Sequence, residues 1–562
     1  MYLETLFKMR FAIYSLLAFG LSCSASAASL HEEIDSYVEA GFSRFEVAPA
    51  QRCDDDEFVR RIYLDFTGKI PDARTASRFI ANTNPEKRAS LIQQLLDSNA
   101  FAERMAVVFD VMLMERRADK YVTTPEWRAY LAKSFAENKP LDVLAREILV
   151  GGSVEDELRP AGKFYLDRAV DKDALVRDTG RLFLGMDLQC AQCHDHPTID
   201  DWKHQHYFGL SVFFAGSKIY KRPDGKIALQ ENLIPDVEFV SVFKPDITNK
   251  TGPQVPFGKT LTIPPFEKGE EFVEKPSKTV PAVLKFGLRD LLANELPTSQ
   301  TPAFSRNLAN RLWGIMLGRG IVHPYDMDHS ENPPSHPELL DFLSLQLQEL
   351  KFDTKTFLKE IALSETYQRS SAAPVGVDPN SIPPESFAMA ILKGLSPEQL
   401  FESLLASTQS DDVFASQIEA SLREDGEKYE ELSADGEKME VARTDQRTKR
   451  IAEFVGTFAS TPGRPEGEFQ ASLPQALFLA NYNAVVEWLE PRDGNLAEQL
   501  LGRDEPRSVA EDAYLAILSR YPTEEEIALA TEHFEARGQK RPAAVTELIW
   551  SLIASAEFRL NH

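Results

Sequence analysis

Eight consecutive residues hold the densest group of reactive side chains in the sequence. Residues 190 to 197 read C-A-Q-C-H-D-H-P and contain two of the four cysteines and two of the ten histidines. On a helical turn, Cys190 and Cys193 are three residues apart and face the same side. Both sulfurs can then reach the vinyl groups of one porphyrin, and His194 can turn its imidazole to the iron as an axial ligand. This C-x-x-C-H pattern predicts covalent attachment of a c-type haem through Cys190, Cys193 and His194.

The histidines that follow the motif leave a second interpretation open. His196 lies two residues beyond His194, so it cannot reach the opposite face of the same haem. Thiolate and imidazole groups also bind zinc and iron, so a non-haem metal site is the alternative. Its candidate ligands are His194 and His196, with Cys190, Cys193, His204 and His206 as further choices. Three carboxylates could orient these imidazoles as outer acceptors: Asp195, Asp200 and Asp201.

A six-coordinate haem would need a distal ligand from elsewhere in the chain. The available donors are Met186, His323, Met327, His329 and His336. Several lie in a segment, residues 323–336, that is dense in imidazoles and carboxylates and could bind a metal or line a pocket. The same segment is also typical of a loop before a helix, with Ser335 as the N-cap and Pro337 in the first turn. Three side chains on one helix face are expected to dock this loop by pairing with its carboxylates: Arg306, Asn310 and Arg311.

The N-terminus has the pattern of a secretory signal. Lys8 and Arg10 precede an apolar run over residues 11–21, and Ala25-Ser26-Ala27 fits a cleavage site. The run is too short to span a bilayer, and no later stretch reaches 18 apolar residues. We therefore expect residues 1–27 to be a signal peptide and the mature protein to be exported to the periplasm or cell envelope.

The cysteine count agrees with an exported protein that is not a disulfide scaffold. Cys23 falls within the predicted signal, where lipidation is a further option, although Gly20 stands where a lipobox has an aliphatic residue. Removal of the signal leaves Cys53, Cys190 and Cys193. A disulfide between Cys190 and Cys193 is the third interpretation of the motif, because the compartment is oxidising.

Composition limits the classes of partner. The chain has 562 residues, more than one core usually organises, with 43% hydrophobic and 27% charged residues. Its formal net charge is −25 and its isoelectric point about 5.0. Because such a surface repels phosphate backbones, a nucleic-acid partner is not expected.

Periodicity predicts a mainly α protein with two helical domains joined by a small irregular β insert. Residues 28–215 show helical spacing, residues 216–283 are rich in β-formers, turns and prolines, and residues 284–562 are helical again. Residues 409–450 form a charge-rich excursion, read as a solvated helical or mobile segment. A weak repeat places serine three residues before an aromatic plug at Ser98–Phe101, Ser364–Tyr367 and Ser555–Phe558, which indicates repeated scaffold.

Longer motifs carry a resemblance to known families. Residues 60–71, 184–197 and 213–216 resemble the planctomycete cytochrome-like domain of unknown function. The second half is similar to its usual companion, the planctomycete surface domain of unknown function, in these segments: 306–313, 318–320, 332–340, 364–368, 395–400 and 555–558. The resemblance implies an exported protein of bacteria that degrade complex polysaccharides, and no established activity. Thr198 stands where members often have an aromatic or aliphatic residue.

These observations favour an exported protein that uses haem c for electron transfer or redox chemistry. The alternative is a zinc- or iron-binding protein, or a scaffold or binding protein associated with polysaccharide utilisation. The expected partner is accordingly a redox partner or other polysaccharide-utilisation proteins. The common hydrolase signatures G-x-S-x-G and H-E-x-x-H do not occur in the sequence, so whether the chain is an enzyme stays open.

Overall fold

The computed structural model describes residues 28–562 apart from residues 153–156, 224, 226, 278–280, 425, 464–474, 476–477, 480–481 and 493. The predicted signal peptide and Cys23 lie outside the described residues. Within them the fold is mainly α, as predicted, and strands pair only into two-stranded antiparallel sheets.

The segment before the insert folds as successive helices joined by short turns. These are α2 (Leu30–Phe45), α3 (Asp55–Thr67), α4 (Ala73–Ala81), α5 (Lys87–Leu96), α6 (Asn99–Met114), α7 (Thr124–Ala136), α8 (Leu141–Val150), η1 (Arg159–Gly162), α9 (Lys163–Leu166), α10 (Lys172–Leu184), η2 (Cys190–Gln192) and α11 (His204–Ala215). Local sequence sets their ends. Asp171 accepts the Ala174 N–H at the start of α10, and Gly185, at φ 71°, ends that helix in a left-handed conformation.

The predicted β-rich insert is confirmed as three hairpins. They are β1 (Ser217–Lys221) with β2 (Ile227–Glu231), β3 (Val237–Ser241) with β4 (Lys244–Thr251), and β5 (Phe272–Glu274) with β6 (Val283–Leu284). Alternation along β3 turns Phe239 toward α11, where its ring stacks on Phe208 at 4.5 Å between centroids. This contact fixes the direction in which the β3–β4 hairpin projects.

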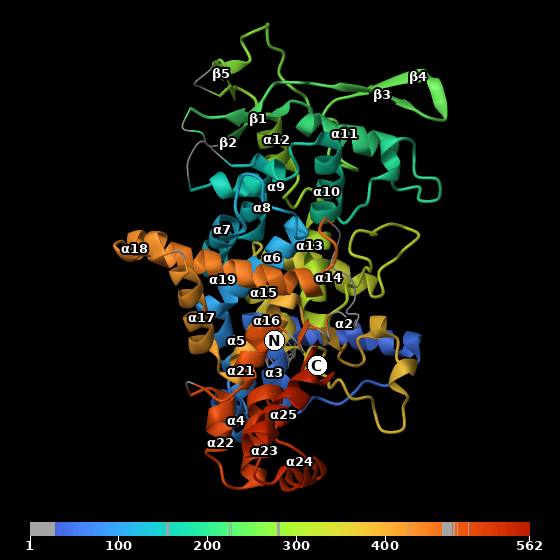
Figure 1. Ribbon diagram of the computed structural model, residues 1–562. Coiled ribbons are helices and arrows are strands. Elements are labelled where there is room, and N and C mark those ends of the chain that lie inside the picture. Colours follow the sequence, from blue (N-terminus) through green and yellow to red (C-terminus); the bar gives the residue numbers. More distant parts are fainter. Residues whose placement is uncertain are drawn as a thin grey trace, which may run out of the picture.

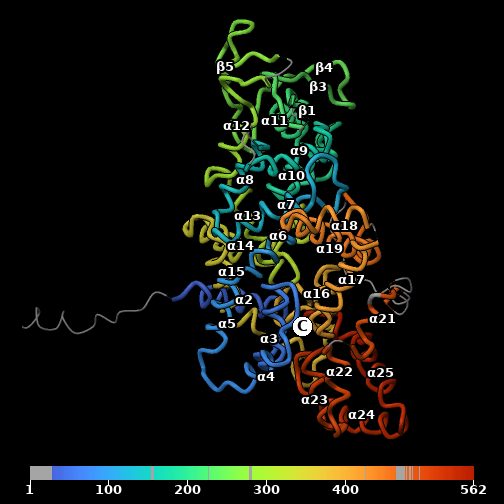
Figure 2. Tube along the Cα trace, turned by 60° about the vertical axis from the view of Figure 1, so that its left-hand side comes forward, coloured from blue at the N-terminus to red at the C-terminus, as the bar shows by residue number. Residues whose placement is uncertain are grey.

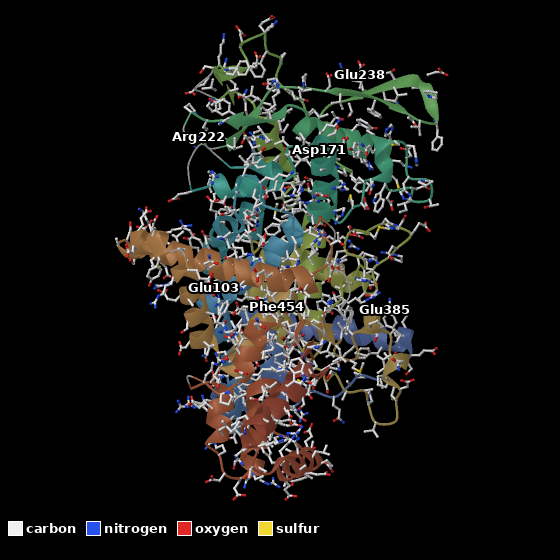
Figure 3. All side chains as sticks on the ribbon, in the orientation of Figure 1. Glu103, Asp171, Arg222, Glu238, Glu385 and Phe454 are labelled. Atoms are coloured by element: carbon white, nitrogen blue, oxygen red, sulfur yellow. The ribbon has the colours of Figure 1, made fainter. Side chains whose placement is uncertain are left out.

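Helices resume after the insert and continue to the C-terminus. They are α12 (Leu288–Glu295), α13 (Pro302–Leu317), α14 (Pro337–Glu349), α15 (Thr354–Leu363), η3 (Pro379–Ser381), η4 (Pro384–Ser386), α16 (Pro397–Thr408), α17 (Asp411–Arg423), α18 (Gly426–Ser433), α19 (Gly436–Phe458), α21 (Asn483–Leu489), α22 (Leu496–Leu501), α23 (Pro506–Leu518), α24 (Glu524–Arg537) and α25 (Arg541–Ala554). A short pair, β7 (Lys393–Gly394) and β8 (Leu560–Asn561), joins the end of the chain to its middle. The charge-rich excursion is helical, and α19 attaches it by burying Met439 and Phe454. Phe454 is labelled in Figure 3.

The molecule is elongated, with the hairpins at one end and α22 to α25 at the other (Figures 1 and 2). Its largest hydrophobic core collects residues between Ile34 and Ala388, together with Leu515, and includes helices from both sides of the insert. A second core collects residues 395–558, together with Leu64 and Ile70 from the first helices. The core therefore does not divide at the insert, and the segments before and after it are packed together.

The predicted serine–aromatic repeat is a recurrent way of ending a helix. In each copy the serine hydroxyl accepts the backbone N–H of the aromatic residue three positions later, at 3.3 Å for Phe101, 3.2 Å for Tyr367 and 3.2 Å for Phe558. The same hydroxyl donates to the carbonyl three residues earlier, at 2.6 to 2.7 Å. All three aromatic rings are fully buried. The repeat is therefore a scaffold element, as its sequence indicates.

Candidate functional site

The C-x-x-C-H motif forms a single 3-10 turn. Cys190 to Gln192 make η2, and the backbone N–H groups of Cys193 and His194 approach the Cys190 carbonyl at 3.3 and 3.5 Å. Residues three apart eclipse one another in this type of helix, so both sulfurs lie on one face of the turn. Both thiols are free and exposed to solvent. The turn thus presents two exposed thiols one 3-10 turn apart.

His194 has the tautomer that an axial ligand needs. Its Nδ1 donates to the Asp195 carbonyl at 2.5 Å, which leaves Nε2 as the ring nitrogen that can bind iron. The ring also contacts Phe243 at 4.8 Å between centroids. Phe243 stands at the tip of the β3–β4 hairpin, where the Val242 N–H donates to the Cys193 carbonyl at 3.1 Å. An exposed apolar tip, with Val242 60% and Phe243 72% exposed, therefore lies against the motif.

His204 holds the backbone of the motif in place through a hydrogen bond. Its Nε2 donates to the Gln192 carbonyl at 3.2 Å, and its ring is buried between Phe208 and Phe239. Burial lowers the pKa of His204, so it holds the turn in its neutral form. His206, two residues on, turns to Phe257, and its Nδ1 accepts the Lys203 N–H at 3.3 Å. The two histidines that were predicted as alternative ligands thus take separate structural positions.

Two of the three carboxylates near the motif hold backbone groups. Asp195 accepts the His204 N–H at 2.8 Å at the start of α11, and Asp201 accepts the Ser330 N–H at 2.7 Å. Asp200 instead pairs with the Lys203 side chain at 3.4 Å. These bonds fix the shape of the loops, and the orientation of an imidazole by the three carboxylates stays a prediction. Sequence spacing carries no signal for this difference, because a helix-capping aspartate and an imidazole-orienting aspartate look alike.

A histidine–tryptophan–histidine contact joins the motif to the segment 323–336. The ring of His196 meets the edge of buried Trp202 at 5.5 Å, and His329 meets it at 4.9 Å. The Nδ1 of His196 accepts the Ile199 N–H at 3.0 Å, which assigns the proton of the neutral ring to Nε2. Trp202 and His329 are 127 positions apart and are not linked by any local pattern, so this contact could not be read from the sequence. It places the second histidine-rich segment beside the first.

Backbone bonds continue this contact. Asp187 N donates to the Asp326 carbonyl at 2.9 Å, Asp328 N donates to the Gly185 carbonyl at 3.1 Å, and Met186 and Met327 form a β-bridge between them. Two of the predicted distal donors therefore lie side by side: Met186 in the segment that leads into the motif, and Met327 in the segment 323–336. His336 lies elsewhere, buried against Phe45 and Phe387, and His323 packs on Tyr325.

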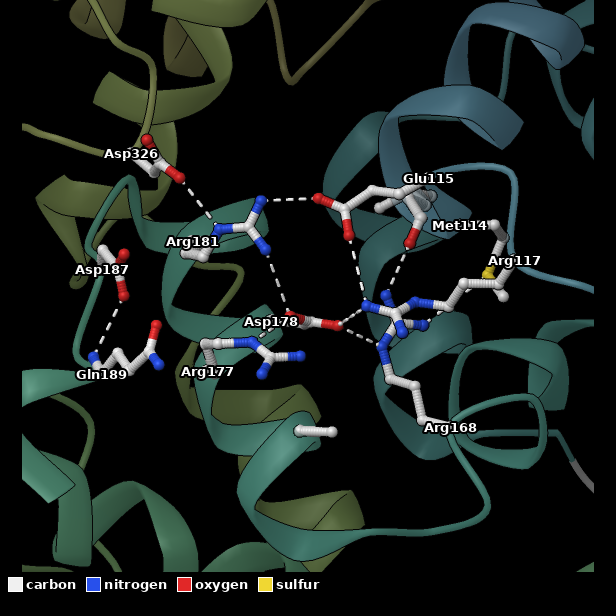
Figure 4. A network of polar contacts seen from close by, with 12 residues as sticks. Met114, Glu115, Arg117, Arg168, Arg177, Asp178, Arg181, Asp187, Gln189 and Asp326 are labelled. Carbon is white, nitrogen blue, oxygen red and sulfur yellow. Dashed lines mark hydrogen bonds and ion pairs between the residues drawn. The ribbon is translucent and has the colours of Figure 1, made fainter. Parts of the chain in front are cut away.

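A buried charge network fixes the base of this junction (Figure 4). Arg181 on α10 pairs with Glu115 at 2.5 Å and, across to the second segment, with Asp326 at 2.9 Å. Asp178, one turn earlier, is fully buried and pairs with Arg168 at 2.6 Å and Arg117 at 3.0 Å. Because Asp326 lies in the loop after α13 and the other members precede the insert, the Arg181–Asp326 pair joins both halves beside residues 185–187.

The expected docking of the loop is confirmed for one of its three side chains. Arg306 pairs with Asp328 at 2.8 Å. Asn310 instead bonds to the backbone of Val322 through both ends of its amide, and Arg311 donates to the Arg181 carbonyl at 2.8 Å. The helix start after the loop is also confirmed, with one correction: α14 begins at Pro337, and the N-cap position is His336, not Ser335.

The described residues contain no group of three or more His, Cys, Asp or Glu side chains arranged to hold a metal ion. The reason is visible in the turn itself, since His204 and His206 diverge and His196 bonds to its own loop. A zinc or iron site built on these residues stays a prediction. The donor set does fit a c-type haem, because two exposed sulfurs on one face adjoin an imidazole with Nε2 available.

Comparison with family models matches two regions. Residues 33–218 match PSCyt2, a protein of unknown function (DUF1549), and residues 288–534 match PSD1, a protein of unknown function (DUF1553). The two matches follow one another along the chain in this order. The β hairpins between Ser217 and Leu284 fall almost entirely in the segment between the two matches. No curated protein and no solved structure matches the chain.

Among the described residues, no helix is both long enough and apolar enough to cross a membrane.

Proposed function

We propose that the chain is an exported c-type haem protein that transfers electrons at the cell envelope. One observation carries the proposal: a single 3-10 turn presents two exposed thiols on one face, followed by a histidine whose Nδ1 is already bonded. The PSCyt2 match over the same region supports it, as does the predicted signal peptide.

Each residue of the turn has a distinct role. Cys190 and Cys193 would hold the haem through thioether bonds to its two vinyl groups. His194 would offer Nε2 to the iron, because the Asp195 carbonyl already accepts from Nδ1. The bound iron supplies a one-electron redox couple. His204 keeps the Gln192 carbonyl, and with it the turn, in place.

The surroundings supply an apolar contact for a porphyrin. The hairpin tip, Val242 and Phe243, is exposed and touches both Cys193 and His194. A large planar apolar ring beside the hairpin tip would remove this surface from water. Such burial stabilises a complex by roughly 25 cal/mol per Å² of apolar surface. A soluble electron carrier also implies a redox partner, which the proposal places in the same exported compartment.

The test is expression of the full sequence in a bacterium that attaches c-type haem during export. The purified wild type should show a Soret band and should retain haem on a denaturing gel. Cys190→Ala and Cys193→Ala should lose the attachment, singly in part and together completely. Cys53→Ala is the matched control. Cys53 is buried in contact with Arg88 and lies outside the motif, so this variant should keep the haem.

Other outcomes would change the assignment. A haem stain that survives the double substitution would contradict the proposal. Zinc or iron in stoichiometric amount, without a Soret band and lost in His194→Ala, would support the metal alternative. A colourless, metal-free protein would leave the scaffold or binding role in polysaccharide utilisation.

A further inference from the structure

A cavity of about 570 Å³ lies at the hairpin end of the molecule. Its wall combines three parts of the chain: the end of α8 with η1, the hairpins of the insert, and the start of α12. The first part falls in the first family match, the last in the second, and the hairpins lie between. Ligand sites occur preferentially at such junctions, and the volume suits a small molecule.

Glycines allow the backbone to form this wall. Gly151 ends α8 at φ 81°, and a Cβ there would lie 2.6 Å from the Leu229 side chain and 2.8 Å from Tyr165. A Cβ on Gly162 would lie 2.8 Å from the Gly151 carbonyl oxygen. Larger residues would therefore push the strand β2 away from α8 and η1. The cavity keeps its shape because these segments approach one another without side chains between them.

The polar part of the lining is mainly cationic. Three arginines, Arg159, Arg222 and Arg289, face two carboxyl groups, Glu231 and Asp290. Glu231 is buried and is held by the α12 start, where its Oε1 accepts the backbone N–H groups of Leu288 at 3.0 Å and Arg289 at 3.2 Å. Burial raises the pKa of Glu231 to about 7. The negative charge of Asp290 also raises this pKa, and the positive charge of Arg289 lowers it. At neutral pH Glu231 therefore carries less than a full negative charge. The lining thus presents three guanidinium groups, of which Arg159 is also paired with Glu126 at 2.7 Å.

Two of these arginines have donors to spare. The Nε atoms of Arg159 and Arg289 are buried and have no hydrogen-bond partner among the described residues. Arg289 uses Nη1 on the Val150 carbonyl at 2.7 Å, and its Nε approaches Glu231 only at 3.8 Å. A buried guanidinium N–H without an acceptor is costly, at about 1–3 kcal/mol. An acceptor supplied by a ligand would remove that cost.

The rest of the lining is apolar. Leu166, Ile227, Leu229 and Leu284 contribute aliphatic side chains, and Pro281 and Ala282 continue the surface. We propose that this cavity binds a small organic anion, whose carboxylate or sulfonate group faces the arginines and whose apolar body lies on the aliphatic wall. The three guanidinium groups disfavour a metal cation, and the volume excludes a macromolecule. The site is separate from the C-x-x-C-H turn and does not depend on haem.

Arg222 is the position at which to test the site. It follows β1 at the outer edge of the hairpin end (Figure 3), so substitution there leaves the packed core intact. The probe is 8-anilinonaphthalene-1-sulfonate, an aromatic sulfonate that fluoresces when it leaves water, titrated into the full mature chain. The wild type should bind it saturably, and benzoate should displace it. Arg222→Gln should weaken binding about tenfold or more, because a charged hydrogen bond is lost, whereas Arg222→Lys should retain most of it.

Two further variants complete the experiment. Ala228→Trp should abolish the benzoate-displaceable signal by filling the cavity, since Ala228 lines it on β2. Arg74→Gln, at an exposed arginine on α4, is the matched control for the loss of one positive charge and should bind as the wild type does. Unchanged circular dichroism would show that each variant is folded. The proposal is overturned if folded Arg222→Gln and Ala228→Trp both bind the probe with wild-type affinity, or if Arg74→Gln weakens binding as much as Arg222→Gln.

Discussion

Substitution of Asp178 by asparagine should test the buried charge network at the base of the candidate site. The carboxylate is fully buried and receives four guanidinium groups: Arg168 at 2.6 Å, Arg117 at 3.0 Å, Arg177 at 3.0 Å and Arg181 at 3.3 Å. Burial alone would raise the pKa of Asp178, yet these arginines hold it below its ordinary value. The side chain is therefore ionised at neutral pH.

The expected loss follows from the charges left behind. Asparagine keeps the size of the side chain but leaves Arg168, whose side chain has no exposed surface, without its carboxylate. Removing one partner of a buried ion pair usually costs 3–5 kcal/mol, since the remaining charge stays desolvated. Glu115 and Asp326 still neutralise Arg181, so we expect the lower end of that range, about 3 kcal/mol.

The assay is urea unfolding followed by far-UV circular dichroism, read at the transition of the larger core, which contains α10. Arg177→Gln is the matched control. It removes a contact to the same carboxylate from a side chain that is one-third exposed, so its cost should stay below about 1 kcal/mol. A stability loss for Asp178→Asn no greater than that of the control would refute the reasoning.

Three further predictions concern single residues. Burial lowers the pKa of His336 to about 4, below its value of 6.5 in the unfolded chain. The neutral ring therefore contributes fully to folding stability above pH 6.5, and this contribution is lost as pH falls toward 4. The loss of stability should reach about 3 kcal/mol. The melting temperature of His336→Gln should therefore depend less on pH between 6.5 and 4 than that of the wild type. Parallel curves of melting temperature against pH would contradict the assignment. Gly216→Ala should destabilise the protein by about 1–3 kcal/mol in urea, because a Cβ there would lie 1.8 Å from the Asn232 carbonyl oxygen; a neutral result would show that the β1–β2 hairpin shifts freely. Ser364→Ala should cost about 1 kcal/mol, since the Tyr367 N–H loses its acceptor, and hydrogen exchange at Tyr367 should accelerate; unchanged exchange would count against the repeated helix ending.

Local patterns predicted the fold well because they depend on neighbouring residues. Helical spacing identified the helices on both sides of the insert, and β-formers with turn residues identified the hairpins. The serine–aromatic spacing at Ser364 and Tyr367 corresponds to a specific pair of hydrogen bonds. Cys190 and Cys193 likewise fall within a single turn, so their spacing depends on local structure alone.

The remainder of the site depends on contacts between distant residues. The meeting of Trp202 with His329, and of Arg181 with Asp326, arises from packing of segments more than 100 residues apart. The β3–β4 tip reaches His194 only because Phe239 anchors the hairpin on α11. Even within the motif, Asp195 could not be assigned from its position, because its acceptor role is set by where the His204 N–H lies.

The most direct test of the haem assignment is the intact mass of the exported protein under denaturing conditions. The account predicts a mature chain heavier than its amino acids by the mass of one haem, with the added mass located on the peptide that contains Cys190 and Cys193. A polypeptide from a haem-attaching host that weighs only what its residues weigh, and shows no Soret absorption, would contradict it.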